Sequence, residues 1–92
     1  MAFVYILHCA DNTFYVGQTA NLDSRVAFHN AGLGCRYTAR RRPVALVHFE
    51  EFPTHAAARV HERQLKHWSA KKKKALATGD FAALNALSKR RR

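Results

Sequence analysis

Five side chains of this chain have the types that phosphodiester hydrolysis uses. Tyr5 and Tyr15 each stand inside an apolar run and could act as acid, base or positioning groups. Arg25 could clamp a phosphate oxygen, and His29, four residues later, could relay a proton near neutral pH. Glu62 is a carboxylate among basic residues, a setting that keeps it ionised and suits a hard divalent cation. Together these residues predict a metal-assisted phosphodiesterase site.

Each of these residues also has an ordinary structural interpretation. Aromatic residues in strands are usually core, and a helix arginine or histidine is usually on the surface. The Glu62 carboxylate could instead form an ion pair with Arg59, Arg63 or Lys66, an interaction of little energetic weight. The hypothesis therefore depends on all five occurring together.

The charge balance indicates a polyanionic partner. Sixteen Lys and Arg residues face six Asp and Glu residues, for a net charge of +10, which is typical of proteins that bind nucleic acid. Tyr37 could stack on a base or touch phosphate, or it could simply pack in a loop. The other residues that we expect to contact substrate are basic: Arg40, Arg41, Arg42 and Lys66.

Several other protein classes are disfavoured. No apolar run approaches the roughly 20 residues that a membrane span needs, and the N-terminus does not resemble a secretory signal. Cys9 and Cys35 show no disulfide or CxxC spacing, and the six histidines form no zinc-finger spacing with them. We expect free thiols, no zinc, and a cytoplasmic protein associated with the nucleoid and not with a membrane.

The two tyrosines must be positioned by a β-hairpin. Residues 3–8 and 14–18 are aromatic and branched, which predicts two strands. Paired residues on antiparallel strands share a face. A two-residue turn would place Tyr5 and Tyr15 on opposite faces, whereas a three-residue loop at 11–13, pairing Ala10 with Phe14, places them on one face with Gly17. We predict the three-residue loop, with a left-handed bulge position at residue 12 or 13.

The remaining elements follow from capping signals. Asn21 predicts the start of a helix that ends at Gly32 and turns Leu22, Val26 and Phe28 inward. Residues 32–43 are expected to be a loop and 44–50 a third strand. Helices are predicted from Thr54 to about residue 67, from Ser69 to 78, and over 81–87.

The predicted fold class is mixed α/β: a small three-stranded antiparallel sheet flanked by helices, in the order β-β-α-β-α-α-α. We expect one domain over residues 1–92, with a core at about 2–78 and a basic C-terminal extension at 79–92.

The ordered motifs resemble the GIY-YIG nuclease superfamily, in its short single-domain bacterial form. Phe3-Val4-Tyr5 stands where the family has Gly-Ile-Tyr, and Tyr15-Val16-Gly17 where it has Tyr-Ile-Gly. The helix around Glu62 resembles the one that bears the family's metal-binding glutamate. The resemblance covers roughly residues 2–78.

The resemblance implies an endonuclease that cuts DNA with one divalent ion, Mg²⁺ or Mn²⁺. Glu62 would hold the ion and Arg25 the phosphate, while Tyr5, Tyr15 and His29 would position and deprotonate water; which of the three is the base stays open. Gly17 would let substrate approach the hairpin. DNA repair or recombination on branched structures would be the setting, with RNA as an alternative substrate.

The chain also departs from the family pattern. The first triplet lacks its glycine, and larger members carry a separate DNA-binding domain that this chain does not show. We therefore expect its own basic clusters to hold substrate, or a partner protein to deliver it. The alternative functions are a nucleic-acid-binding protein of the same fold with little activity, and a scaffold that recruits a nuclease.

Overall fold

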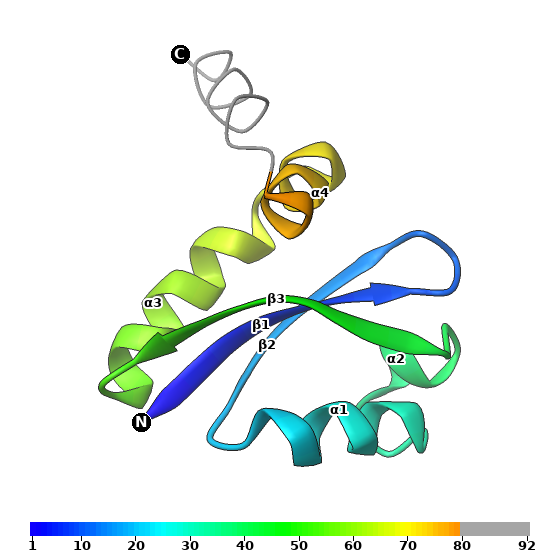
Figure 1. Cartoon of the computed structure of the whole chain (residues 1–92), viewed down its shortest axis with the longest axis horizontal. Helices are drawn as coiled ribbons and strands as arrows, with labels where there is room; N and C mark the ends of the chain where they lie inside the picture. Colours follow the sequence, from blue (N-terminus) through cyan, green and yellow to red (C-terminus); the bar gives the residue numbers. More distant parts are fainter. Residues whose placement is uncertain (80–92) are drawn as a thin grey trace.

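The computed structural model describes residues 1–79, in which a three-stranded sheet lies between helices (Figure 1). One helix, α1, covers one face of the sheet, and two helices, α3 and α4, cover the other. The elements are β1 (Ala2–Cys9), β2 (Phe14–Thr19), α1 (Leu22–Asn30), α2 (Arg36–Ala39), β3 (Val44–Phe52), α3 (His55–Lys66) and α4 (Ala70–Thr78).

The sheet has the strand order β2-β1-β3, with both neighbours antiparallel to β1. The fold class is therefore confirmed, as mixed α/β with a small antiparallel sheet. The short helix α2 is additional, because residues 32–43 had been predicted to be a loop. The helix predicted at 81–87 and most of the basic extension lie outside the described residues.

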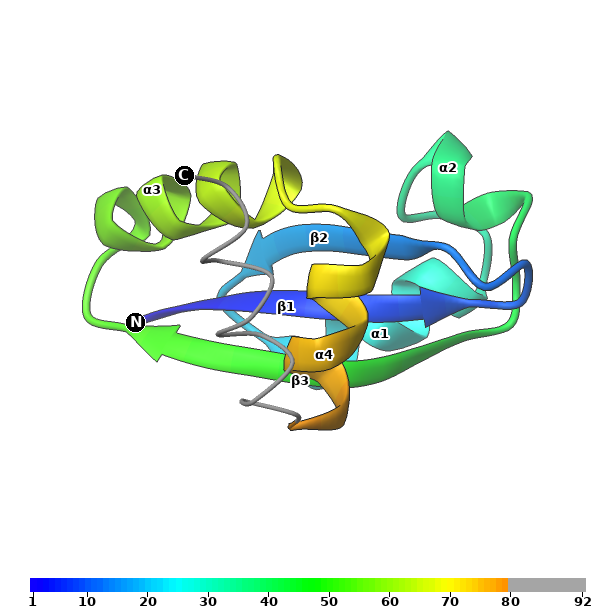
Figure 2. The same ribbon diagram turned by 90° about the horizontal axis from the view of Figure 1, so that it is seen from above.

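The alternation of side chains along β1 divides the core in two. Val4 and Ile6 are fully buried against α3, whereas Tyr5 and Leu7 face the α1 side. A side-chain period of two makes both faces of this central strand apolar, because both are covered. Seen from above, α3 runs beside β2 and α4 crosses over the strands (Figure 2).

In the hairpin, the side chains of Tyr5 and Tyr15 point to the same face, as predicted, but the strand register differs from the predicted one by two positions. Tyr5 pairs with Gly17 and His8 with Phe14, so the predicted pairing of Ala10 with Phe14 is wrong. The loop does hold three residues, 10–12, because Cys9 N–H bonds to the Thr13 carbonyl oxygen (2.9 Å). Asn12 occupies the left-handed position, with φ 68°. A shift of two positions preserves the side-chain facing, so Tyr5, Tyr15 and Gly17 still share a face.

The helix boundaries follow the capping signals. The Asn21 and Thr54 side chains accept hydrogen bonds from the backbone of the first turns of α1 and α3, and Ser69 does the same for α4. Gly32, at φ 82°, follows α1, as expected for a glycine beyond a helix end. The inward packing predicted for Phe28 is wrong, since 47% of this residue is exposed.

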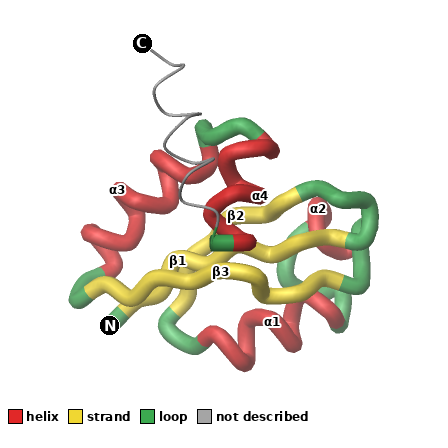
Figure 3. The backbone as a smooth tube through the Cα atoms, turned by 45° about the horizontal axis from the view of Figure 1, so that its top comes forward, coloured by secondary structure: helices red, strands yellow, loops and turns green. Residues whose placement is uncertain are grey.

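One end of the sheet collects the loops. The β1–β2 loop and the segment around α2 lie together there (Figure 3). Arg41 joins them, because its guanidinium pairs with Asp11 (2.9 Å) and its carbonyl oxygen accepts from Ala10 N–H (2.9 Å). This end therefore holds α2 close to the hairpin that carries the two tyrosines.

Within the described part of the chain, no helix is both long enough and apolar enough to span a membrane.

Candidate active site

Tyr5 and His29 form the centre of the site. The Tyr5 hydroxyl lies 2.9 Å from His29 Nε2, and both residues are almost fully buried. His29 Nδ1 lies 2.7 Å from Thr38 Oγ1, which can donate its own proton to the Cys35 carbonyl oxygen. With that assignment Nδ1 carries the imidazole proton, so Nε2 accepts the hydrogen bond that Tyr5 donates.

Tyr15 completes an aromatic cluster around this pair. Its ring centroid is 6.4 Å from that of Tyr5 and 5.2 Å from that of His29. Tyr37 continues the cluster outward, with its centroid 5.9 Å from Tyr15. Because Tyr5 and Tyr15 share a face of β1 and β2, the hairpin presents both phenols to the helix that carries His29.

Burial sets the protonation of the cluster. It raises the pKa of Tyr5 well above the ordinary value, and Tyr15 adds to the effect. Burial and the nearby Cys35 raise the pKa of Tyr15 to about 12. Burial and the Arg25 charge lower the pKa of His29 below its usual value. At neutral pH the cluster thus holds protonated phenols beside a neutral imidazole.

Arg25 and Glu62 act on the same cluster from two different helices. The positive charge of Arg25 lowers the pKa of both tyrosines, and the negative charge of Glu62 raises it. Coulombic effects of this kind require proximity. Arg25 on α1 and Glu62 on α3 are therefore both within range of charge interactions with the phenols that the hairpin carries.

Glu62 is only 14% exposed at its side chain and pairs with Lys66 (2.7 Å), one of the three partners considered from the sequence. Among residues 1–79, no group of three or more His, Cys, Asp or Glu could hold a metal ion. A Mg²⁺ ion bound through one carboxylate keeps waters and substrate phosphate as its other ligands. The mostly buried carboxylate of Glu62 fits an ion bound in that way.

Gly17 has a packing role that the sequence did not indicate. A Cβ at this position would lie 2.5 Å from the Tyr5 hydroxyl oxygen and 3.1 Å from a ring carbon of Tyr15. Any side chain here would displace the phenols. The absent side chain therefore makes room for the two tyrosines, which pack against the backbone of β2.

The sequence analysis did not identify the residues that orient His29. Thr38, which is fully buried, lies on the unpredicted helix α2. Gly34 packs so closely on the imidazole that a Cβ there would collide with Nδ1. Cys35 lies beside Thr38 and Tyr15, whose hydrogen bonds lower the pKa of its thiol although burial opposes this. Only the glycine-rich composition of residues 32–35 could have signalled a close approach.

Gln18 is a further residue that sequence reasoning missed. Its side-chain oxygen is buried and has no hydrogen-bond partner among the described residues. Gln18 and Arg25 both line a hollow of about 450 Å³ where β2 meets the start of α1. Its polar side chain directly after the apolar run 14–17 was the available signal.

The basic residues expected to contact substrate differ in their surroundings. Arg41 stacks on the Tyr37 ring at 3.8 Å and pairs with Asp11, and Arg42 donates to the carbonyl oxygens of Ala39 and Asn30. The Arg40 side chain is exposed, and it makes no hydrogen bond or ion pair with the described residues. Arg40 is therefore the most available of the three for an external phosphate.

Comparison with known proteins agrees with this arrangement. Residues 1–75 match the GIY-YIG catalytic domain. A UPF0213 protein of Haloquadratum walsbyi is 47% identical over 75 residues, which are 82% of this chain and 84% of the relative. A UPF0213 protein of Natronomonas pharaonis is 49% identical over 74 residues, which are 80% of this chain and 87% of the relative.

A solved structure shows the same likeness. The solution NMR structure of a UPF0213 protein from Bacillus halodurans is 39% identical, with a TM-score of 0.53, over 85% of this chain and 84% of that one. The matched residues contain the hairpin tyrosines, the Arg25–His29 helix and Glu62. The chain therefore belongs to the GIY-YIG nuclease family.

Proposed function

We propose that the protein is a divalent-metal-dependent endonuclease that hydrolyses DNA phosphodiester bonds. The observation that carries this proposal is the hydrogen-bonded Tyr5–His29 pair, placed beside an arginine and a carboxylate in a domain of this family. Such a cluster offers a base, a phosphate-binding cation and a metal ligand on one surface.

The proton path starts at the buried pair. His29 Nε2 accepts the proton of the Tyr5 hydroxyl, and the Tyr5 oxygen in turn accepts a proton from the attacking water. The water oxygen then bonds to phosphorus as the bond from phosphorus to the leaving deoxyribose oxygen breaks. The lowered pKa of His29 keeps the imidazole neutral beforehand, which this step requires.

Arg25 and Glu62 have separate roles in this scheme. The Arg25 guanidinium binds a non-bridging phosphate oxygen and stabilises the charge that develops there. Glu62 would hold one Mg²⁺ or Mn²⁺ ion in place of the Lys66 ammonium group. When bound, the ion would neutralise phosphate charge and stabilise the leaving oxygen. The Lys66 side chain is 51% exposed and can move into solvent, and the divalent cation would replace its positive charge beside the carboxylate.

One experiment tests the proposal directly. Purified protein is incubated with linear, nicked and branched DNA at low salt, with Mg²⁺, Mn²⁺ or EDTA. We expect cleavage that EDTA and Glu62→Gln both abolish. Glu51→Gln is the matched control, because Glu51 is an exposed glutamate on β3. The Glu51→Gln protein should cleave DNA normally. Cleavage that survives both EDTA and Glu62→Gln would contradict the mechanism.

The second candidate function is a nucleic-acid-binding protein of the same fold with little activity. The Glu62–Lys66 ion pair favours it, because it occupies the carboxylate that would hold the metal. DNA binding without cleavage, in both the unaltered protein and the Glu62→Gln variant, would support this function and exclude the nuclease.

A further inference from the structure

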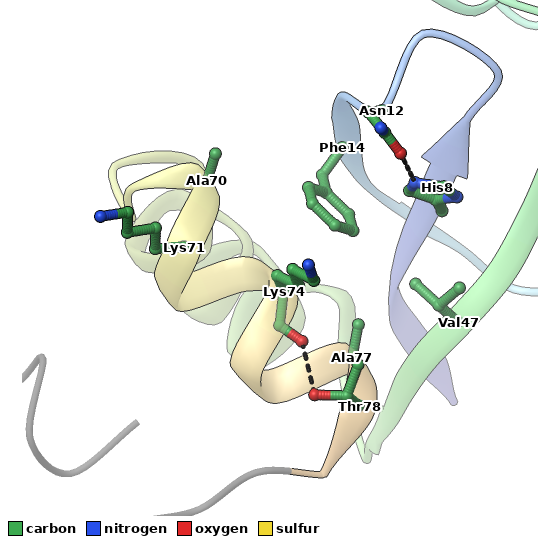
Figure 4. Close-up of a pocket in the computed structure, with 9 residues that line it drawn as sticks. All are labelled: His8, Asn12, Phe14, Val47, Ala70, Lys71, Lys74, Ala77 and Thr78. Atoms are coloured by element: carbon green, nitrogen blue, oxygen red, sulfur yellow. Dashed lines mark hydrogen bonds between the residues drawn. The ribbon is translucent and has the colours of Figure 1, made fainter. Parts of the chain in front are cut away.

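A hollow of about 490 Å³ opens between the β1–β2 hairpin and α4, away from the Tyr5–His29 pair. Figure 4 shows Phe14 and His8 on its hairpin side and Ala70, Lys71 and Lys74 on its helix side. Its volume is within the range of small-ligand sites. We call it the hairpin–α4 hollow.

The hairpin side of this hollow offers aromatic faces and an amide. Phe14 and His8 lie with their ring centroids 5.2 Å apart. The Asn12 side-chain oxygen lies 2.9 Å from His8 Nε2, which orients both groups at the rim. Aromatic rings beside a hydrogen-bonding amide are the means by which proteins hold an unpaired nucleobase.

The helix side of the hollow supplies cations. Of the four consecutive lysines in α4, Lys72 is buried and lies over the Trp68 ring at 4.2 Å. Lys71 and Lys74 line the hairpin–α4 hollow, and Lys73 lines a second hollow of about 220 Å³. Burial and the nearby Lys66 lower the pKa of Lys73, an effect that a phosphate would relieve.

The two hollows lead toward the candidate active site. They share Asn12, Phe14 and Ala70 as lining residues, and the second hollow extends to Tyr37. The Tyr37 ring lies 5.9 Å from the ring of Tyr15. A continuous path of aromatic and basic side chains thus runs from the catalytic cluster, around the hairpin, to the hairpin–α4 hollow.

We propose that the hairpin–α4 hollow binds an unpaired nucleotide of a single-stranded DNA segment. Its base would lie against Phe14, and its flanking phosphates would contact Lys71 and Lys74. Only a base that has left its duplex exposes a face for this contact, so the hollow would favour branched or frayed substrates over plain duplex. The inference rests on the proposed nuclease function, since it specifies which DNA that site would receive.

The test measures binding without cleavage. Fluorescence anisotropy in EDTA compares a labelled oligonucleotide with an abasic strand that carries the same number of phosphates. We expect the strand with bases to bind about tenfold more tightly, because stacking acts in addition to phosphate contacts. Ala70→Phe should remove this preference, because exposed Ala70 lines both hollows and a phenyl ring would fill them.

Ala56→Phe is the matched control. Ala56 is an exposed alanine near the start of α3 that lines neither hollow, so the base preference should persist in this variant. Circular dichroism checks that both variants fold. Lys71→Ala combined with Lys74→Ala should weaken binding of both strands while the preference for bases remains.

Equal affinity for the two strands, or a preference that Ala70→Phe leaves intact, would overturn the proposal. Since the assay contains no divalent metal, its result is independent of cleavage. Cleavage without base preference would refute the hollow as a nucleotide site and leave the nuclease standing. Base preference without cleavage in the Mg²⁺ assay would support the hollow as a nucleotide site and refute the nuclease function.

Discussion

At the scale of single residues, His29 is where burial acts most directly on the proposed chemistry. Its ring is 1% exposed, hydrogen-bonded on both nitrogens and close to a positive charge. The burial and the positive charge both favour the neutral imidazole. A surface histidine, the alternative that the sequence left open, is excluded by this burial.

We predict that cleavage falls as the pH drops through the lowered pKa of His29, below its usual value of about 6.5. The imidazolium cannot accept the Tyr5 proton. His29→Gln should reduce the rate by about 100-fold and remove this limb of the pH profile. An NMR titration of His29 with its midpoint above 6.5 would contradict the assignment.

The same group links pH to stability. Unfolding returns His29 to its ordinary pKa, so the unfolded chain binds more protons in the interval between the lowered value and about 6.5. His29 therefore makes stability decrease as the pH falls through that interval, and the contribution is fully present above it.

At the scale of elements, Asn30 fastens α1 to β3. Its side chain donates to the Val44 carbonyl oxygen (2.9 Å) and accepts from Val44 N–H (2.8 Å). Val44 is 5% exposed, so these backbone groups have little access to water. The contact joins the end of the helix carrying Arg25 and His29 to the edge of the sheet.

We predict that Asn30→Ala lowers the free energy of unfolding by about 1–3 kcal/mol, because it leaves both Val44 backbone groups without partners. Asn30→Asp retains an acceptor for Val44 N–H and should have a smaller effect. Urea denaturation followed by circular dichroism measures both. An Asn30→Ala variant as stable as the unaltered protein would show that water replaces the side chain.

How far elements could be predicted depended on how local their causes are. The caps Asn21, Thr54 and Ser69 set the helix starts because their partners lie three residues away. The hairpin facing was predictable because shifting the register by two positions leaves side-chain orientation unchanged. Helix α2 was missed because its four residues are stabilised by contacts with His29 and the hairpin.

At the scale of the whole molecule, the net charge of +10 would govern the encounter with the DNA that the proposed function requires. Binding releases counterions from phosphates, so the logarithm of affinity should fall linearly with the logarithm of salt concentration. The basic residues are spread over several elements, so sequence-independent contacts should contribute much of the affinity.

We predict that Arg40→Ala reduces the slope of log affinity against log salt concentration on duplex DNA by about 0.9, the value for one phosphate contact. Arg40 is chosen because its guanidinium is exposed and makes no hydrogen bond to the described part of the chain. Arg59→Ala, which removes another exposed arginine, on α3, is the comparison variant. Anisotropy titrations from 50 to 200 mM salt give both slopes, and an unchanged slope for Arg40→Ala would place Arg40 outside the DNA contact.

The sequence alone determined the three strands, the helices α1, α3 and α4, the facing of Tyr5 and Tyr15, and the family, because each depends on side-chain periodicity, on capping residues or on motifs read in order. Only the tertiary structure decided how these residues meet. It buried His29 between Tyr5 and Thr38, gave Gly17 its packing role and opened the hairpin–α4 hollow beside Phe14. These features join residues distant in the chain, and their contacts arise only when the helices close over the sheet.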